Sequence, residues 1–462
     1  MELKYFERDV YQDILDWASK RDTALLLSGP RQVGKTYLLK KLGAEYFERC
    51  VYVNLMEEDE SNRLDGILKR HYDNHSGSSG TFPWEVVWSE FDSAYVNAPS
   101  TLVVIDEIQE SSAWYNRIRS LRRELKSRLA VTGSYLGRTK NLSFKVPAGD
   151  LSYLEMGSLS YVEFLKANGI YDEYNAIKSF DKIELSEQEL EVYRRVEKLY
   201  DIYCLIGGYP TVVQKWTGEH SIEECLTEIQ TLITVFQDEC SRYFDAVIND
   251  FLWNKAMVEV TKSIISRATD LGRRDGELAQ ATIEIKLQPT NEYTMARKDK
   301  IAALSWLSDA ALIGIVGVID DIKFKTESNT KFRFYVRDMG ILNVISDRIL
   351  GLQESDLAGM RAENFVYLYL QDKLKKDFNG YMVMNYTEPN SQAEIDFIIG
   401  TKKRDCIGIE VKASHGKVKS GDDALKANHI SKLIKVQDSF GGVTEDKITI
   451  PIFAIDKILS II

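Results

Sequence analysis

An eight-residue motif near the N-terminus is the feature that most constrains how this chain can fold. Residues 29–36 read G-P-R-Q-V-G-K-T and match the phosphate-loop pattern G-x-x-x-x-G-K-[ST] at every position. The motif follows an apolar run at 24–28 and precedes a helical pattern at 37–42, which is the strand, loop and helix order that phosphate binding requires. Further strand and helix patterns alternate as far as about residue 160, which predicts a parallel sheet covered by helices.

Each part of the motif has an expected task in holding a triphosphate. Two glycines, Gly29 and Gly34, let the backbone curl so that successive N–H groups face a phosphate, and the positive end of the following helix adds to the attraction. We expect Lys35 to reach the β- and γ-phosphates and the Thr36 hydroxyl to bind Mg²⁺. The predicted nucleotide-binding residues are Gly29, Pro30, Arg31, Gln32, Val33, Gly34, Lys35 and Thr36.

Two acidic residues follow a second apolar run, at 101–105. Asp106 is expected to hold Mg²⁺, directly or through water, and Glu107 to orient and deprotonate an attacking water. Acidic pairs also occur as ordinary solvated strand ends, but the phosphate loop upstream favours the catalytic interpretation. Ser134 ends a later strand pattern, where its hydroxyl can contact the γ-phosphate as a sensor or simply belong to a turn.

These motifs, in this order, resemble a known group of proteins. The stretches G-P-R-Q-V-G-K-T, I-D-E-I-Q at 105–109 and T-G-S-Y-L at 132–136 are similar to the prokaryotic AAA-superfamily ATPases that carry a C-terminal domain of unknown function. The resemblance extends from Tyr5 to the C-terminus and implies ATP binding, Mg²⁺-dependent hydrolysis and a restriction-endonuclease-like C-terminal domain. Other similar stretches lie at 158–165, 207–210 and 334–340.

The pattern along the chain and the resemblance together predict four regions. Residues 1–165 are expected to form the AAA-type P-loop ATPase domain, and 166–245 a helical region with a Gly-Gly-Tyr-Pro turn at 207–210. Residues 246–348 read as helices followed by a hairpin, a winged-helix-like pattern, and 349–462 as a helix with closely spaced strands. The predicted fold class is α/β: a P-loop NTPase parallel sheet with helices on both faces, then a helical and winged-helix-like region and a small α/β nuclease-like domain.

The last region contains a second candidate site. If a hairpin brings Asp396 beside Glu410, the two carboxylates can bind Mg²⁺ while Lys412 activates a water or steadies charge on a phosphate. This is the D…E-x-K arrangement of nucleases, and Glu363 on the preceding helix resembles the extra carboxylate that such domains often add. The E-x-K spacing recurs elsewhere in the chain, so a structural acidic cluster, or a domain that binds without cutting, stays an alternative.

Charge narrows the range of partners. A formal net charge of −11 argues against wholesale coating of nucleic acid and leaves only local basic surfaces as docking sites. One basic run is a solvated face, a nucleic-acid or partner contact, or the source of an arginine that acts at a neighbour's nucleotide. Its members are Arg117, Arg119, Arg122, Arg123, Lys126 and Arg128.

Composition also bears on metals and on the cell compartment. The five cysteines include no C-x-x-C pair and the five histidines no paired-ligand spacing, which argues against a zinc site and favours free, mostly buried thiols in a reducing compartment. A charged N-terminus and the lack of a long apolar run predict a cytoplasmic protein that does not cross a membrane.

The leading hypothesis is an ATP-binding protein that hydrolyses ATP with Mg²⁺. Its nucleotide state would control the binding of DNA or a protein partner through the C-terminal domains. One alternative is a nucleotide-regulated binding switch with little turnover. Another is an ATP-dependent nuclease that uses the C-terminal carboxylates.

Overall fold

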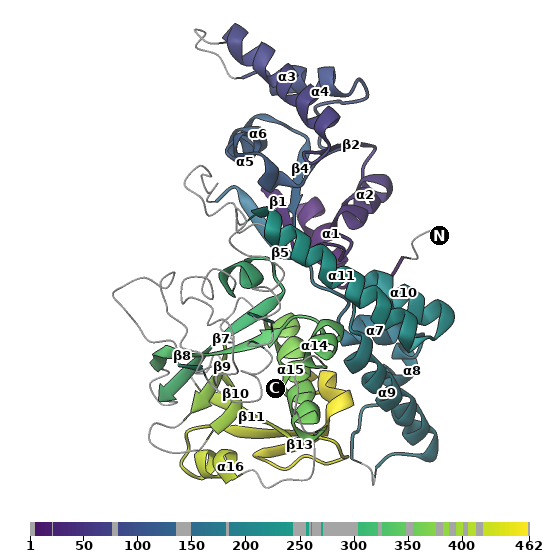
Figure 1. Ribbon diagram of the computed structural model, residues 1–462, viewed down its shortest axis with the longest axis vertical. Coiled ribbons are helices and arrows are strands. Elements are labelled where there is room, and N and C mark those ends of the chain that lie inside the picture. The colour runs from purple at the N-terminus through teal and green to yellow at the C-terminus, as the bar shows by residue number, and fades with distance from the viewer. Residues whose placement is uncertain are drawn as a thin grey trace, which may run out of the picture. The chain divides into compact units, whose positions relative to one another are not determined.

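The computed structural model shows two compact units (Figure 1). The N-terminal unit is Glu7–Gly157, and the C-terminal unit is Ser158–Ile462 together with Met1–Phe6. The division therefore falls after Gly157, earlier than the predicted end of the first domain at residue 165. The structure describes residues 5–20, 22–75, 82–134, 149–181, 184–243, 256–257, 260, 269–270, 304–321, 326–347, 354–375, 382–387, 394–400, 405–412 and 419–460.

A five-stranded parallel sheet forms the centre of the N-terminal unit, as predicted. Its strands, in spatial order, are β2 (Arg49–Asn54), β3 (Thr101–Asp106), β4 (Arg128–Gly133), β1 (Ala24–Ser28) and β5 (Leu151–Glu155). Leu26 and Val103 pack into one core while their neighbours Leu25 and Leu102 are equally buried on the other face. Because successive strand residues point to opposite faces, both faces of the sheet are covered, which is typical of an α/β domain.

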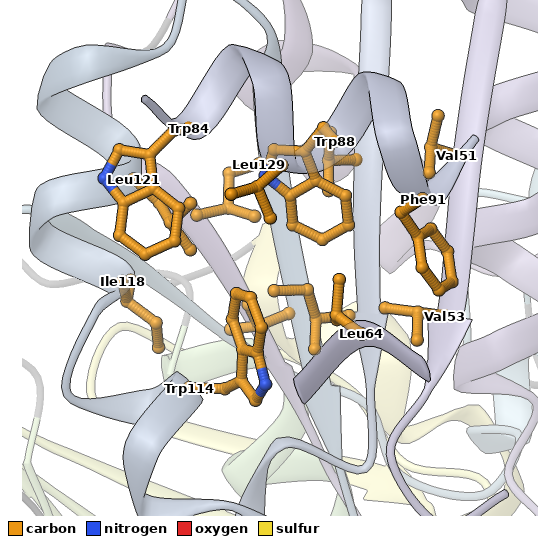
Figure 2. Packing of buried hydrophobic residues seen from close by; sticks show 14 of the residues in the cluster. Val51, Val53, Leu64, Trp84, Trp88, Phe91, Trp114, Ile118, Leu121 and Leu129 are labelled. Carbon is orange, nitrogen blue, oxygen red and sulfur yellow. The ribbon is translucent and has the colours of Figure 1, made fainter. Parts of the chain in front are cut away.

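Helices flank this sheet along the chain. They are α1 (Val10–Lys20), α2 (Lys35–Tyr46), α3 (Glu58–His75), α4 (Trp84–Phe91), the short 3₁₀ helix η1 (Ile108–Glu110), α5 (Ser112–Tyr115) and α6 (Ile118–Glu124). On one face, three tryptophans fill the space between the strands and α3 to α6 (Figure 2). The ring of Trp114 lies 6.1 Å from that of Trp84 and 5.9 Å from that of Trp88. These large buried rings dominate the packing on this face and hold the helices against the sheet.

The C-terminal unit begins with a group of helices. They are α7 (Tyr161–Ala167), α8 (Tyr171–Ala176), α9 (Glu187–Ile206), α10 (Pro210–Glu219) and α11 (Ile222–Tyr243), followed later by α14 (Met339–Ser346), α15 (Glu354–Lys375) and α16 (Lys419–Lys426). Ser160 and Ser186 start α7 and α9 with capping boxes. The Gly-Gly-Tyr-Pro turn separates α9 from α10, which confirms the predicted turn.

Three stretches singled out in the sequence meet at that turn. The Gly208 amide donates to the Asp338 carboxylate at 2.9 Å, and the Leu159 amide donates to the Gly208 carbonyl at 2.7 Å. A Cβ atom on Gly208 would lie 2.0 Å from the Leu159 carbonyl oxygen, so only glycine fits. Asp338 is buried and also caps α14 by accepting from the Gly340 and Ile341 amides. The turn therefore joins α7, α9 and α14 into one framework.

An eight-stranded mixed sheet completes the C-terminal unit. Its spatial order is β13 (Lys447–Pro451), β12 (Lys432–Gln437), β11 (Cys406–Lys412), β10 (Glu394–Gly400), β9 (Met382–Thr387), β7 (Ile313–Asp321), β8 (Thr326–Val336) and β6 (Thr269–Asp270), and the 3₁₀ segment η4 (Ile452–Ser460) follows β13. The sheet corrects one expectation. The hairpin assigned to a winged-helix-like region pairs through β7 with β9, so the strands before and after residue 348 share one sheet. The predicted helices before this hairpin cannot be compared, because most of residues 246–303 lie outside the described residues.

Two compositional expectations can be compared with the described part of the chain. Cys204, Cys225 and Cys406 are buried free thiols and Cys50 is an exposed one, while the Cys240 side chain lies outside the described residues. None of the helices in the described ranges has both the length and the apolar composition that a membrane-spanning segment needs.

Candidate nucleotide-binding site

The loop between β1 and α2 has the backbone geometry of an anion cradle. Gly29 and Gly34 have φ angles of +144° and +98°, in the region that favours glycine. A Cβ atom on Gly29 would lie 1.9 Å from the Met156 carbonyl oxygen, so the close packing is a second reason why only glycine fits at this position. Gly34 is the N-cap residue of α2 and, as a glycine, has no side chain with which to cap the first turn. The N–H groups of a helix start attract anions, so this is where a phosphate would bind.

Lys35 holds a positive charge at the centre of this loop. Its side chain is buried, and the ammonium group donates to the carbonyl oxygens of Gly29 and Pro30, both at 2.8 Å. Phosphate oxygens that enter the loop would compete with these two carbonyls for the same charge. Because of its bonds to Gly29 and Pro30, the Lys35 side chain is folded back over its own loop.

Asp106 at the end of β3 lies beside the loop, where it contacts Thr36. The Thr36 hydroxyl donates to Asp106 Oδ2 at 2.7 Å, and the Tyr52 hydroxyl donates to the same oxygen at 2.8 Å. Burial raises the pKa of Asp106, and the nearby charge of Glu107 adds to this shift, while the bonds from Thr36 and Tyr52 oppose it. A hydroxyl and a buried carboxylate this close form the hard oxygen donor set that suits Mg²⁺.

Glu107 is held in an unusual backbone conformation. Its φ and ψ angles are 53° and 47°, the left-handed region, which costs a non-glycine residue about 1 to 2 kcal/mol. Its side-chain oxygen Oε2 accepts from Gln109 Nε2 at 2.5 Å and from Ser134 Oγ at 3.1 Å. Strain of this kind concentrates at functional sites, and here it accompanies a carboxylate fixed by two donors.

Sequence reasoning did not single out several residues of this site. Tyr52 reaches Asp106 because β2 is the neighbour of β3, with Tyr52 opposite Val104. Gln109 was visible only as the last letter of I-D-E-I-Q. Arg31 Nε lies 3.4 Å from Ser134 Oγ and links the loop to the end of β4. Arg31 belongs to the predicted phosphate loop, but its contact with Ser134, like that of Tyr52 with Asp106, depends on strand order and could not be predicted.

Four arginines of the basic run lie near the amino ends of the strands, at the opposite edge of the same sheet: Arg119, Arg122, Arg123 and Arg128. Arg119 and Arg123 pair with Asp150 at 3.1 and 3.0 Å, and Arg122 pairs with Asp22. Asp22 and Asp150 precede β1 and β5, whereas the loop and Asp106 follow the carboxyl ends of parallel strands. These arginines are thus engaged in ion pairs within the N-terminal unit, away from its own nucleotide loop.

The second candidate site brings two of its three predicted carboxylates together. Phe397 pairs with Ile409 in the antiparallel β10 and β11, which places Asp396 opposite Glu410. The buried Glu410 lies 3.3 Å from Lys412 Nζ and accepts from the Gly421 amide at 3.1 Å. Burial raises the pKa of Glu410 to about 7, and the charge of Asp396 contributes in the same direction.

The third carboxylate has a different partner. Glu363 accepts from the buried guanidinium of Arg333 and, at 2.8 Å, from the Tyr335 hydroxyl, while Arg333 also bonds to Glu394 at 3.1 Å. Burial raises the pKa of Glu363 to about 7, with Arg333 opposing and Asp396 adding to the shift. Among the described residues, no group of three or more His, Cys, Asp or Glu side chains is placed to hold a metal ion. The predicted site at Glu363, Asp396 and Glu410 stays a prediction.

Two stretches of the chain match families of known proteins. Residues 21–165 match the family described as an AAA domain. This part of the chain, which contains the loop at 29–36, is similar to an AAA domain. Residues 358–452 match a domain of unknown function, DUF4143. Both the phosphate loop and Asp106 lie inside the AAA domain, so the geometry described above belongs to it.

No curated protein matches the chain. Among solved structures, it is similar to a Walker-type ATPase of Pyrococcus abyssi, with 14% identity, coverage of 75% of this chain and 96% of the other, and a TM-score of 0.40. It is also similar to the ADP form of the Aeropyrum pernix ORC2 protein, with 14% identity, 74% and 92% coverage and a TM-score of 0.30. A third similar structure is PCH-2 of C. elegans, with 13% identity, 49% and 63% coverage and a TM-score of 0.25.

Proposed function

We propose that this protein binds ATP and hydrolyses it with Mg²⁺ in its AAA domain. The observation that carries the proposal is the 2.7 Å hydrogen bond from Thr36 to Asp106, because it brings the end of the phosphate loop and the acidic strand end into one site. Glu107, next in the chain, is held beside Ser134 at 3.1 Å. The preference for adenine over guanine is taken from the family resemblance.

Each side chain has a role that follows from its contacts. Thr36 and Asp106 would hold the metal, which when bound neutralises phosphate charge. Lys35 turns from the carbonyls of Gly29 and Pro30 to the β- and γ-phosphates. Because Gln109 and Ser134 both donate to Glu107 Oε2, we assign the other oxygen, Oε1, to the attacking water.

Ser134 has a second contact that suits a sensor. Its hydroxyl lies between the Glu107 carboxylate and Arg31 of the loop, at 3.1 and 3.4 Å. A γ-phosphate that draws Arg31 or the serine hydroxyl toward itself would change how Glu107 is held. The serine therefore connects the state of the phosphate to the position of the base.

Phosphate release by the wild type and by Glu107→Gln tests hydrolysis. We expect the variant to bind ATP but turn it over about 10² to 10⁴ times more slowly, which is the usual contribution of a general base. Lys35→Ala should lose ATP binding. Glu110→Gln is the matched control, because Glu110 is a nearby carboxylate at the end of the 3₁₀ helix η1, which begins directly after Glu107. This variant should hydrolyse ATP at the wild-type rate. Equal background-level release by wild type and Glu107→Gln would refute hydrolysis and leave a binding switch.

We also propose that the nucleotide state controls binding of DNA or a protein partner by the C-terminal unit. The support is the covalent order of the chain, in which an AAA domain precedes a unit with a separate cluster of charged groups around Asp396, Glu410 and Lys412. Affinity for DNA, measured by fluorescence anisotropy with ATP, with ADP and without nucleotide, tests the DNA form of this proposal. A change of affinity between the three conditions is expected. Identical weak binding in all three would direct the search to a protein partner.

An ATP-dependent nuclease is a second candidate function, favoured by one observation. Asp396 lies opposite Glu410 and Lys412 lies 3.3 Å from Glu410, which resembles the restriction-endonuclease-like arrangement. The pairing of Glu363 with Arg333 favours a domain that binds without cutting. Incubation with DNA and RNA in Mg²⁺ or Mn²⁺, with Asp396→Ala as control, decides between them. Cleavage lost in the variant supports a nuclease, whereas products that persist in the variant indicate contamination.

A further inference from the structure

We propose that Arg8 is a positioning residue that transmits the nucleotide state of the phosphate loop to the joint between the two units. This inference rests on the proposed function, since it requires a nucleotide at the loop. It names the side chain through which a nucleotide in the AAA domain can affect the C-terminal unit.

Arg8 bridges two carbonyl groups that belong to different parts of the N-terminal unit. Its Nη1 atom donates to the Val33 carbonyl, inside the phosphate loop, at 2.9 Å. Its Nη2 atom donates to the Gly157 carbonyl at 2.7 Å. Only 6% of the residue is exposed, so the guanidinium is fixed between these acceptors rather than free to move in solvent. The planar fork of arginine suits this task, because it holds two acceptors at once in a set geometry.

Arg8 lies close to both points at which the chain passes from one unit to the other. The chain passes between the two units twice, between Phe6 and Glu7 and between Gly157 and Ser158. Arg8 is two residues from the first crossing and bonds to the last residue before the second. One side chain therefore connects the phosphate loop with both crossings.

Met156, next to Gly157, makes a second set of contacts with the phosphate loop. The Met156 amide donates to the Ser28 carbonyl at 2.8 Å, directly before the loop. The Met156 carbonyl oxygen occupies the space that a Cβ on Gly29 would need, at 1.9 Å, and its Cε atom lies 3.6 Å from the corresponding position on Gly34. The segment at 156–157 thus lies against both glycines of the loop and shares the Arg8 guanidinium with the Val33 carbonyl.

These contacts give a physical route for coupling. When loop N–H groups turn toward a phosphate, the carbonyls of the same peptide units turn as well, because each peptide is planar. A shift of the Val33 carbonyl changes its bond to Arg8, and the shared guanidinium passes the change to Gly157. Met156 restricts the alternatives, since the loop cannot move toward it without a backbone clash.

The test compares hydrogen–deuterium exchange of the full-length protein with and without the ATP analogue AMP-PNP and Mg²⁺. The peptides to follow cover residues 158–165 and 207–210 of the C-terminal unit. In the wild type, we expect the analogue to change exchange in these peptides. In Arg8→Ala, we expect AMP-PNP still to bind, as measured by calorimetry, while this change is lost.

Two further variants keep the test decisive. Arg8→Lys retains the positive charge but not the fork, so it should bind AMP-PNP and show a reduced change even if Arg8→Ala folds poorly. Arg122→Ala is the matched control, because Arg122 is a partly buried arginine of the N-terminal unit, with a 2.8 Å bond to the Asp22 carbonyl, but lies at the opposite edge of the sheet. It should retain the full wild-type change.

The outcomes separate this inference from the function on which it rests. Wild-type protein that does not bind AMP-PNP would overturn both. Binding without any change of exchange in the C-terminal peptides, a full change in both Arg8 variants, or the same loss in Arg122→Ala would overturn the coupling and leave the proposed ATPase intact.

Discussion

Replacing the buried Glu410 by glutamine should remove a large pH dependence from the stability of the C-terminal unit. Burial raises the pKa of this carboxyl from 4.5 to about 7. The folded protein therefore keeps the proton on Glu410 over a pH range in which the unfolded chain loses it. The stabilisation is complete below about pH 4.5 and is lost as the pH rises through about 7.

The magnitude follows from the size of that shift. The difference between about 7 and 4.5 is about 2.5 pH units, and each unit corresponds to about 1.4 kcal/mol, so the contribution is about 3 kcal/mol. The side chain is only 4% exposed, so solvent screening does not reduce this value. Glutamine is neutral at every pH and resembles the protonated acid. Relative to the wild type, Glu410→Gln should gain about 3 kcal/mol between about pH 4.5 and pH 8.

Urea unfolding at both pH values is the assay, with hydrogen exchange of the peptide 405–412 as the probe of β11. The Lys412 contact lowers the pKa of Glu410 and is already included in the value of about 7, so its loss needs no separate correction. Glu445→Gln, on an exposed carboxylate of the same unit, is the control and should show no such gain. A difference between Glu410→Gln and wild type that is the same at both pH values would refute the argument from burial.

Two further substitutions test separate parts of the fold. Gly29→Ala should abolish ATP binding, measured by calorimetry, because its Cβ would lie 1.9 Å from a backbone oxygen, while Gly66→Ala, whose Cβ meets only the end of a flexible side chain at 4.0 Å, should bind normally. Normal binding by Gly29→Ala would contradict the loop geometry. Arg333→Met should destabilise the C-terminal unit by about 3 to 5 kcal/mol in urea unfolding, because it leaves Glu363 buried without its cation. A loss below about 1 kcal/mol would show that the pair is not needed.

The nucleotide site could be predicted where its residues are close together in the sequence. The loop from Gly29 to Thr36 is one continuous motif, and Asp106 ends a strand recognisable from its apolar run. Tyr52 could not be predicted, because its bond to Asp106 requires that β2 be the neighbour of β3. Arg8 was missed for a similar reason, since its contact with Val33 forms only after the chain has folded.

The same distinction holds in the C-terminal unit. The proximity of Asp396 and Glu410 could be anticipated, because only a short stretch of sequence separates their strands. The pairing of Glu363 with Arg333 could not, since it joins α15 to β8, and β8 enters the sheet only through the long-range pairing of β7 with β9. That pairing also explains why the predicted boundary at 348 divides strands of a single sheet.

A crystal structure with AMP-PNP and Mg²⁺ is the most direct test of the central claim, which is that Lys35, Thr36 and Asp106 form one ATP site. We predict that the triphosphate lies in the loop at 29–36 and that Lys35 leaves the carbonyls of Gly29 and Pro30 for the phosphates. Mg²⁺ should lie at the Thr36 hydroxyl, next to Asp106. A nucleotide bound elsewhere, or Lys35 still bonded to both carbonyls with the analogue present, would contradict it.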